Sequence, residues 1–207
     1  MDSWFTVEQI DQDTFVISEY RHWEETHCYL LCGTKRAILI DTGLGVSNIR
    51  EVIDGLTKLP VTVITTHVHW DHIGGHKYFQ GVPQMILHDE DCIDLGNRKL
   101  VVIHTPGHSP GHCCFYEADR KYLYSGDLIY SGCLDAFYPS TNPQEFWKSV
   151  RKIQSLKISR ILPGHHHLSI PVTIIDKIET AFHNLSNEGK LKQGNGIFSY
   201  EGFQIHI

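Results

Sequence analysis

Basic side chains are scarce in this sequence of 207 residues, which contains 18 Lys and Arg against 24 Asp and Glu. The net charge is −6 when His is counted as neutral. Nucleic-acid surfaces owe their affinity to Lys and Arg side chains that neutralise phosphates. The chain is therefore expected to have no nucleic-acid partner.

Long hydrophobic runs and paired-cysteine motifs are also missing. No apolar stretch approaches the ~20 residues of a membrane helix, and residues 1–10 lack a basic segment followed by an apolar one. The six cysteines form no CxxC pair and are too few for a disulfide scaffold of this length. We expect a cytoplasmic protein with reduced thiols and no membrane partner, in which residues 1–207 form a single domain.

The N-terminal part changes from strand patterns to a helix pattern. Short segments rich in β-branched and aromatic residues predict strands at Trp4–Ile10, Thr14–Tyr20, Thr26–Cys32 and Arg36–Ile40. A helix is predicted from Ser47, its expected N-cap, because apolar residues between Ile49 and Leu56 recur with helical spacing. Pro60 ends that helix, and the apolar strand Val61–Thr65 follows it.

The second part repeats this order of elements. Further strands are predicted at Gln84–His88, Lys99–His104, Cys113–Glu117, Lys121–Ser125 and Arg160–Leu162. One helix opens at Asn142, a good N-cap followed by proline, and another runs from about Val172 to Gly189. The tail, Gly194–Ile207, alternates like a hairpin. Two groups of strands, each followed by helices, predict two mixed sheets packed together with helices outside.

Histidine is abundant, with 15 residues, and its densest cluster follows the apolar strand Val61–Thr65. His67 and His69 project to the same side of an extended backbone, so both imidazoles can bind one metal ion. Asp71 and His72 come after the chain turns and can face a second ion. A metal centre with two ions is therefore the prediction for this loop.

Three more ligand-type side chains each follow a glycine after a predicted strand, namely His108, Asp127 and His165. The seven candidates divide into His67, His69 and His108 for one ion and Asp71, His72 and His165 for the other, with Asp127 between them. Imidazole and carboxylate ligands suit Zn²⁺ and also accept iron or manganese. Two divalent ions, with zinc preferred, are therefore the expected cofactors.

The motifs T-H-V-H-W-D-H, T-P-G-H-S, S-G-D and P-G-H together resemble those of the metallo-β-lactamase superfamily. Leu39–Gly43 resembles that family's first strand end, and Gly194–Ile207 resembles its closing hairpin. The resemblance implies an α/β (α+β) fold, a four-layer αββα sandwich of two mixed sheets with outer helices. It also implies a dinuclear site at one edge of the sheets.

The chemistry expected from this centre is hydrolysis of a small-molecule thioester, lactone or related ester by a hydroxide that bridges the two ions. Asp71 is the candidate proton carrier. Tyr130 matches a tyrosine that, in the similar acyl-homoserine lactonases, binds the substrate carbonyl. Asp41 is expected to hold the second N–H of a ligand imidazole.

Departures from several branches of the family narrow the expected activity. Asp127 argues against an antibiotic-hydrolysing β-lactamase, and His69 argues against the oxygen-reducing diiron branch. Glyoxalase II carries a C-terminal helical region for glutathione, whereas only 42 residues follow His165 here. The overall likeness is to a branch that includes acyl-coenzyme A thioesterases, through Gly126–Tyr130 and the helix after Pro143.

Several alternatives stay open at this point. His112 could replace His108, and His166 or His167 could contribute to the site. Candidate substrate-binding aromatic residues are Trp70, Trp23, Phe137 and Tyr138, and the turn-rich segment Ser131–Thr141 could form a lid. Other possible functions are a mononuclear iron sulfur dioxygenase, a phosphodiesterase and a non-catalytic metal protein, and a homodimer is possible.

Overall fold

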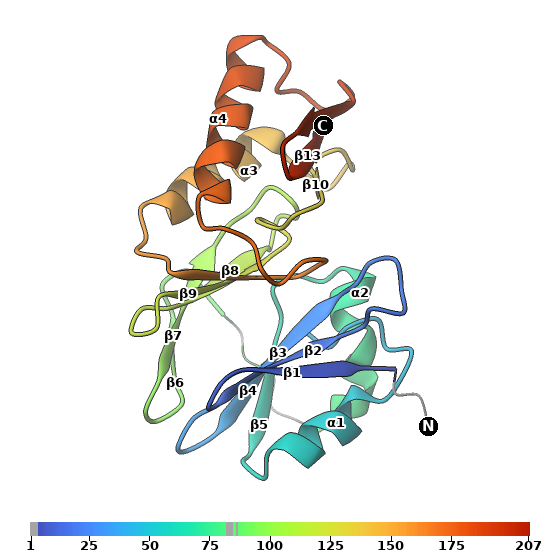
Figure 1. Ribbon diagram of the computed structural model, residues 1–207, viewed down its shortest axis with the longest axis vertical. Coiled ribbons are helices and arrows are strands. Elements are labelled where there is room, and N and C mark those ends of the chain that lie inside the picture. Colours follow the sequence, from blue (N-terminus) through green and yellow to red (C-terminus); the bar gives the residue numbers. More distant parts are fainter. Residues whose placement is uncertain (1–3, 82–84, 86) are drawn as a thin grey trace.

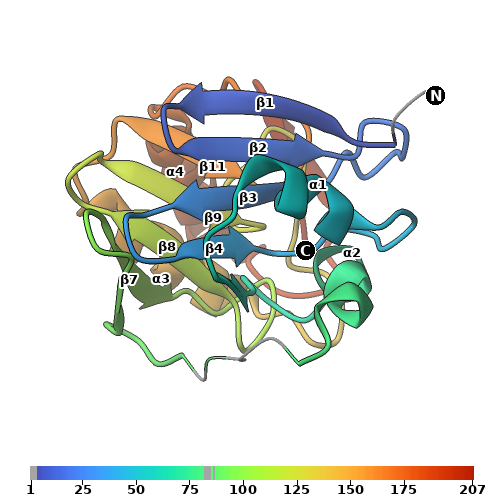
Figure 2. The ribbon, with the colours of Figure 1, turned by 90° about the horizontal axis from the view of Figure 1, so that it is seen from below.

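The computed structural model describes residues 4–81, 85 and 87–207, and its first sheet has five strands. These strands lie side by side in chain order (Figure 2), and they are β1 (Thr6–Asp11), β2 (Thr14–Ser18), β3 (His27–Cys32), β4 (Ala37–Ile40) and β5 (Val61–Ile64). Helix α1 (Ile49–Leu56) connects β4 to β5, and this pair is parallel whereas the other pairs are antiparallel.

The second sheet also has five strands, in the order β11-β9-β8-β7-β6. They are β6 (Cys92–Asp94), β7 (Lys99–His104), β8 (Cys113–Glu117), β9 (Tyr122–Gly126) and β11 (Arg160–Pro163). The parallel pair is again the one joined through a helix, since α3 (Pro143–Gln154) lies between β9 and β11 in the chain. Both sheets are mixed, as predicted.

Three buried apolar clusters correspond to the three spaces between four layers. Strand β4 is buried throughout, and its alternating side chains divide between two of the clusters: Ile38 and Ile40 face the second sheet, whereas Leu39 packs with Ile53 of α1. On the other side, α3 and α4 (Ile174–Asn187) cover the second sheet (Figure 1). The predicted αββα sandwich is therefore present, with helices on both outer faces.

A third, smaller sheet was not predicted. It consists of β10 (Cys133–Asp135), β13 (Phe203–His206) and β12 (Ile197–Tyr200), in that spatial order. The predicted terminal hairpin supplies β12 and β13, and β10 pairs with β13 in parallel. The segment Ser131–Thr141 is thus attached to this sheet through β10, and its suggested role as a lid stays a prediction.

Two further predictions differ from the structure in detail. The N-cap of α1 is Asn48, not Ser47, because the Asn48 side chain accepts a hydrogen bond from the backbone N–H of Arg50. In the predicted strand Gln84–His88, Gln84 and Ile86 lie outside the described residues, and Met85, Leu87 and His88 belong to no strand. The edge strand of the second sheet is instead β6.

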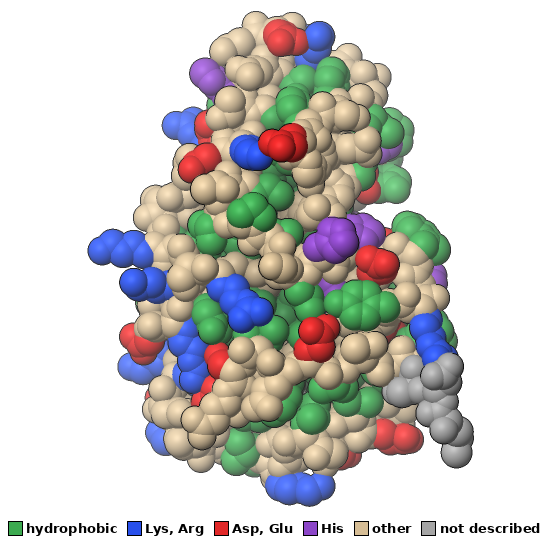
Figure 3. Space-filling view, in the orientation of Figure 1, with side chains coloured by type: hydrophobic (Ala, Val, Ile, Leu, Met, Phe, Trp, Pro, Cys, Tyr) green, Lys and Arg blue, Asp and Glu red, His purple; other side chains and the backbone are tan. Residues whose placement is uncertain are grey.

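Loops that follow β5, β7, β9 and β11 meet at one edge between the two five-stranded sheets. The short helices α2 (Trp70–Ile73) and η1 (Gly74–Phe79, a 3-10 helix) follow β5 directly, so the histidine motif lies where the chain leaves the sheet. Histidine side chains reach the surface between the two halves of the molecule (Figure 3). Among the described residues, no helix is long and apolar enough to cross a membrane.

Candidate metal centre

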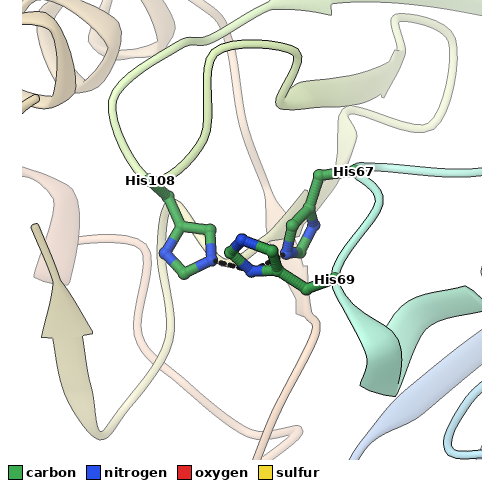
Figure 4. A group of neighbouring side chains, drawn as sticks. All are labelled: His67, His69 and His108. Carbon is green, nitrogen blue, oxygen red and sulfur yellow. Dashed lines mark hydrogen bonds between the residues drawn. The ribbon is translucent and has the colours of Figure 1, made fainter. Parts of the chain in front are cut away.

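Three imidazoles from two loops converge on one point. Nε2 of His67 lies 3.0 Å from Nδ1 of His69, and Nε2 of His108 lies 2.9 Å from the same atom. Figure 4 shows the three rings with these nitrogen atoms turned toward one another. His67 and His69 come from the loop after β5, and His108 comes from the loop after β7, as the spacing of the motifs predicted.

A second group lies beside the first and joins the same loop to the loop after β11. Nε2 of His72 is 3.2 Å from Nε2 of His165, and Oδ2 of Asp71 is 3.7 and 3.5 Å from these two nitrogens. All three side chains are buried. The structure therefore brings together the second predicted set of ligands, Asp71, His72 and His165.

The carboxylate of Asp127 lies between the two groups. Its Oδ2 is 3.3 Å from Nε2 of His108 and 3.2 Å from Nε2 of His165. Its Oδ1 is 3.0 Å from Nε2 of His72, yet this buried oxygen accepts a hydrogen bond from no residue that the structure describes. Oδ1 of Asp127 and Nε2 of His72 are therefore close but not hydrogen-bonded to each other. This arrangement is expected when both atoms are ligands of the same metal ion.

In three of the histidines, Nδ1 makes a hydrogen bond that leaves Nε2 to face the centre. Nδ1 of His165 contacts the carbonyl oxygen of Glu24 at 2.8 Å, and Nδ1 of His108 contacts that of Asp135 at 3.2 Å. A carbonyl oxygen only accepts, so both Nδ1 atoms carry the proton. Nδ1 of His72 likewise donates to the carboxylate of Asp41 at 2.8 Å. The three Nε2 atoms therefore face the centre, as metal binding requires.

The residues fit divalent metal ions. Ligand atoms bound at about 2.0–2.1 Å in a tetrahedron are separated by about 3.3–3.4 Å. The separations within and between the two groups are close to this value, and the donors are imidazole and carboxylate, which zinc, iron and manganese accept.

Asp41 connects the first sheet to the centre. Its backbone has a positive φ of 60°, and its carboxylate accepts hydrogen bonds from the Thr65 hydroxyl and from both the backbone N–H and the hydroxyl of Thr66. The remaining position receives Nδ1–H of His72. Asp41 thus has the contact predicted for it, and Thr66, which also contacts Nδ1 of His67 at 3.0 Å, was not singled out from the sequence.

His112 is buried but does not face the metal groups. Its Nε2 accepts a hydrogen bond from the backbone N–H of Asp127, and its Nδ1 contacts the Thr105 hydroxyl. Burial lowers the pKa of this imidazole to about 3, so the ring is neutral. His108 faces the ligands and His112 supports the backbone of Asp127, which separates the two residues that the sequence left as alternatives.

His27 is a buried, hydrogen-bonded histidine with a structural role. Its Nε2 donates to the carbonyl oxygen of His166, and its Nδ1 accepts from the Ser18 hydroxyl. The backbone N–H of His27 also donates to the carbonyl oxygen of Gly164. These contacts hold the Pro163–His166 loop, and burial lowers the pKa of His27 to about 4.

A cavity of about 550 Å³ opens onto the metal groups. Of the predicted aromatic residues, Trp70, Tyr130 and Tyr138 line it, whereas Trp23 is 74% exposed outside it and Phe137 stacks on His206. The Tyr130 hydroxyl donates to the carbonyl oxygen of Cys133. His166 lines the cavity, and His167 does not.

Two carboxylates in the cavity were not predicted from the sequence. Glu24 and Asp135 both line it, and burial raises the pKa of Glu24 to about 7. Burial also raises the pKa of Asp135, whose carboxylate pairs with His206. Neither belongs to the sequence motifs that predicted the metal ligands, and their position at the cavity follows only from the fold.

Comparison with protein families identifies this architecture. A model of the metallo-beta-lactamase superfamily matches residues 22–88 and 81–165. The chain belongs to the metallo-beta-lactamase superfamily. The family predicted from the histidine motifs is therefore confirmed, and it is a family whose members bind divalent metal ions.

Two curated relatives of this superfamily member are named as hydrolases. The acyl-coenzyme A thioesterase MBLAC2 of Gallus gallus is 26% identical over an alignment that covers 80% of this chain and 82% of the relative. A hydroxyacylglutathione hydrolase of Salmonella typhi is 28% identical over 65% of this chain and 59% of the relative. A hydrolase is also the enzyme class that the sequence predicted.

Solved structures agree on the fold. A metallo-beta-lactamase from Pontibacter korlensis superposes with a TM-score of 0.72, at 18% identity, over 87% of this chain and 99% of that one. The metallo-beta-lactamase IND-7 gives 0.71 at 18% identity, over 86% and 98%. The predicted αββα architecture is confirmed.

Proposed function

We propose that this chain is a dinuclear metallohydrolase, with zinc as the preferred metal, that cleaves a thioester or a related ester or lactone. The position of Asp127 carries this proposal, because its two oxygens face both histidine groups and one of them is buried without a hydrogen bond. A single-ion site would leave half of these donors without a partner.

The ligands divide as their separations indicate. His67, His69 and His108 would hold one ion, Asp71, His72 and His165 the other, and Asp127 would contact both. Two divalent ions in such a cavity supply Lewis acidity that makes water nucleophilic near neutral pH and polarises a carbonyl group.

The protein's own groups would position the substrate and move protons. Asp71 lines the cavity and is the group we assign to carry a proton to the leaving atom. The Tyr130 hydroxyl has one proton, which it donates to the carbonyl oxygen of Cys133. It could donate to a substrate carbonyl only after this hydrogen bond breaks, so we assign Tyr130 primarily to shaping the cavity wall.

The lining of the cavity favours an uncharged acyl group. Trp70, Tyr138 and Pro139 supply apolar surface, and none of the lining residues that the structure describes is Lys or Arg. An anionic leaving group, such as coenzyme A or glutathione, would therefore extend from the cavity toward solvent. The thioester-cleaving relatives support this class of bond.

The proposal is tested by measuring metal content and then hydrolysis rates on matched thioester, lactone, phosphodiester and β-lactam substrates. We expect at least two metal ions per chain, turnover of the thioester or lactone, and loss of turnover after chelation that zinc restores. His67→Ala should lose activity, whereas His88→Ala, at an exposed side chain away from the cavity, should keep it. One iron per chain with oxygen uptake, or turnover of the phosphodiester alone, would contradict the proposal.

A further inference from the structure

A second group of metal-type side chains lies outside the centre described above. It consists of Cys133 and Asp135 on β10 and His206 on β13, and one ligand atom from each of the three lies within 4.8 Å of the other two. These side chains are partly buried, and none of them belongs to the motifs that identify the family.

The pairing of the two strands places these side chains together. Asp135 is directly opposite His206 in the parallel pair, and Cys133 lies two residues before Asp135, on the same face of β10. Nδ1 of His206 is 3.1 Å from Oδ1 of Asp135. The ring of Phe137 stacks on His206 with centroids 4.2 Å apart and planes 7° apart, which fixes the orientation of the imidazole.

The types of ligand atom in this group determine which metal ions it can bind. A thiolate, a carboxylate and an imidazole suit Zn²⁺, with the fourth position left for water, whereas Mg²⁺ and Ca²⁺ prefer oxygen ligands alone. A thiolate and a carboxylate together balance the charge of one divalent ion. Binding would release the thiol proton to solvent, and the imidazole would bind in its neutral form.

We propose that Cys133, Asp135 and His206 form an additional zinc site that joins β10 to β13. The ion would cross-link two strands that are about 70 residues apart in the chain and are otherwise held by the short parallel pairing of β10. The site is also connected to the catalytic centre, because the carbonyl oxygen of Asp135 accepts the hydrogen bond from Nδ1 of His108. Zinc there would help to position one ligand of the proposed dinuclear centre.

The chemistry of sulfur permits a test that does not depend on catalysis. The main centre contains only histidine and aspartate, so cobalt bound there gives no thiolate-to-metal charge-transfer absorption. When the whole protein is loaded with excess Co²⁺ in place of zinc, we expect such a band. Cys133→Ser should abolish it, and Cys92→Ser, at an exposed cysteine on β6, should leave it unchanged.

Metal counting and the His206 ligand provide the second measurement. Cys133→Ser and His206→Ala should each hold one metal ion fewer per chain than the wild type while keeping the cobalt absorption of the histidine centre. If cobalt-loaded wild type shows no sulfur band, or if the band survives in Cys133→Ser, the proposal is overturned. The contact between Asp135 and His206 would then be a hydrogen bond without a metal. This readout is independent of whether the protein hydrolyses any ester.

Discussion

At the scale of single residues, Asp127 combines a side chain that faces both histidine groups with a backbone held by His112. Burial alone would raise the pKa of its carboxyl, but the histidines around it, His165 first, hold that pKa well below its usual range. Asp127 is thus kept as an anion. Its position also depends on the hydrogen bond from its backbone N–H to His112.

Asp127→Asn should therefore remove the anion while keeping the fold, because the backbone hydrogen bond to His112 remains. We expect a loss of kcat/KM of about 10²–10³ or more, together with a lower metal content, since a preorganised charge at the reacting centre is removed. Hydrolysis rates, metal analysis and circular dichroism check this. Asp119→Asn, an exposed carboxylate elsewhere, is the matched control, and full activity in Asp127→Asn would contradict the assignment.

Asp41 would act on a bound metal through His72, with which it shares a hydrogen bond, and through Thr66, which contacts His67. Asp41→Asn keeps the size of the side chain but replaces a charged acceptor, so the His72 imidazole should be held less firmly. Losses of this kind usually lower metal affinity by about 10- to 100-fold. Competition with a coloured chelator measures the change, and excess zinc should restore turnover. Asp54→Asn, on the exposed face of α1, should change neither quantity.

At the scale of elements, the loop after β7 is held against the start of α3. Gly107 has a φ of 139°, and a Cβ at this position would lie 2.2 Å from Cα of Phe146. The next residue is His108, a proposed ligand, so the close contact between loop and helix also sets the direction of that side chain. Only glycine permits both the backbone conformation and the contact.

Gly107→Ala should consequently lower both stability and metal affinity. We expect a loss of about 1–3 kcal/mol in the free energy of unfolding, because the clash is with backbone atoms that cannot turn away. Urea denaturation measures the stability, and metal titration measures the effect on His108. Gly111→Ala is the control, since a Cβ there meets no atom within 4 Å; equal effects of the two substitutions would refute the explanation.

Elements with a strong local pattern could be predicted from the sequence, and elements that depend on a distant partner could not. Helix α3 has Asn142 as its N-cap, as predicted, because the cap is local and the Asn142 side chain accepts hydrogen bonds from the N–H groups of Gln144 and Glu145. Strand β10 has only three residues, and its partner β13 comes about 70 residues later. The convergence of the proposed ligands could be predicted because these residues lie in loops that follow strands, whereas Glu24 reaches the cavity through a loop without a pattern.

At the scale of the whole molecule, the two sheets support the centre by burying neutral histidines beside it. Burial lowers the pKa of His27 to about 4 and that of His112 to about 3, against about 6.5 in an unfolded chain. As the pH falls below 6.5, these two histidines therefore become protonated in the unfolded state but stay neutral in the folded state. The stability that these groups contribute is complete above pH 6.5 and is lost as the pH falls toward 4.

His27→Gln isolates one of these groups because it removes the ionisation while a polar side chain remains near Ser18 and the carbonyl of His166. The wild type should lose stability between pH 6.5 and 4 more steeply than the variant, by up to roughly 1.4 kcal/mol per pH unit for one proton. Urea denaturation at a series of pH values gives both slopes. His183→Gln, on α4 and exposed, should keep the wild-type slope, and parallel curves for wild type and His27→Gln would show that His27 is protonated in the folded protein.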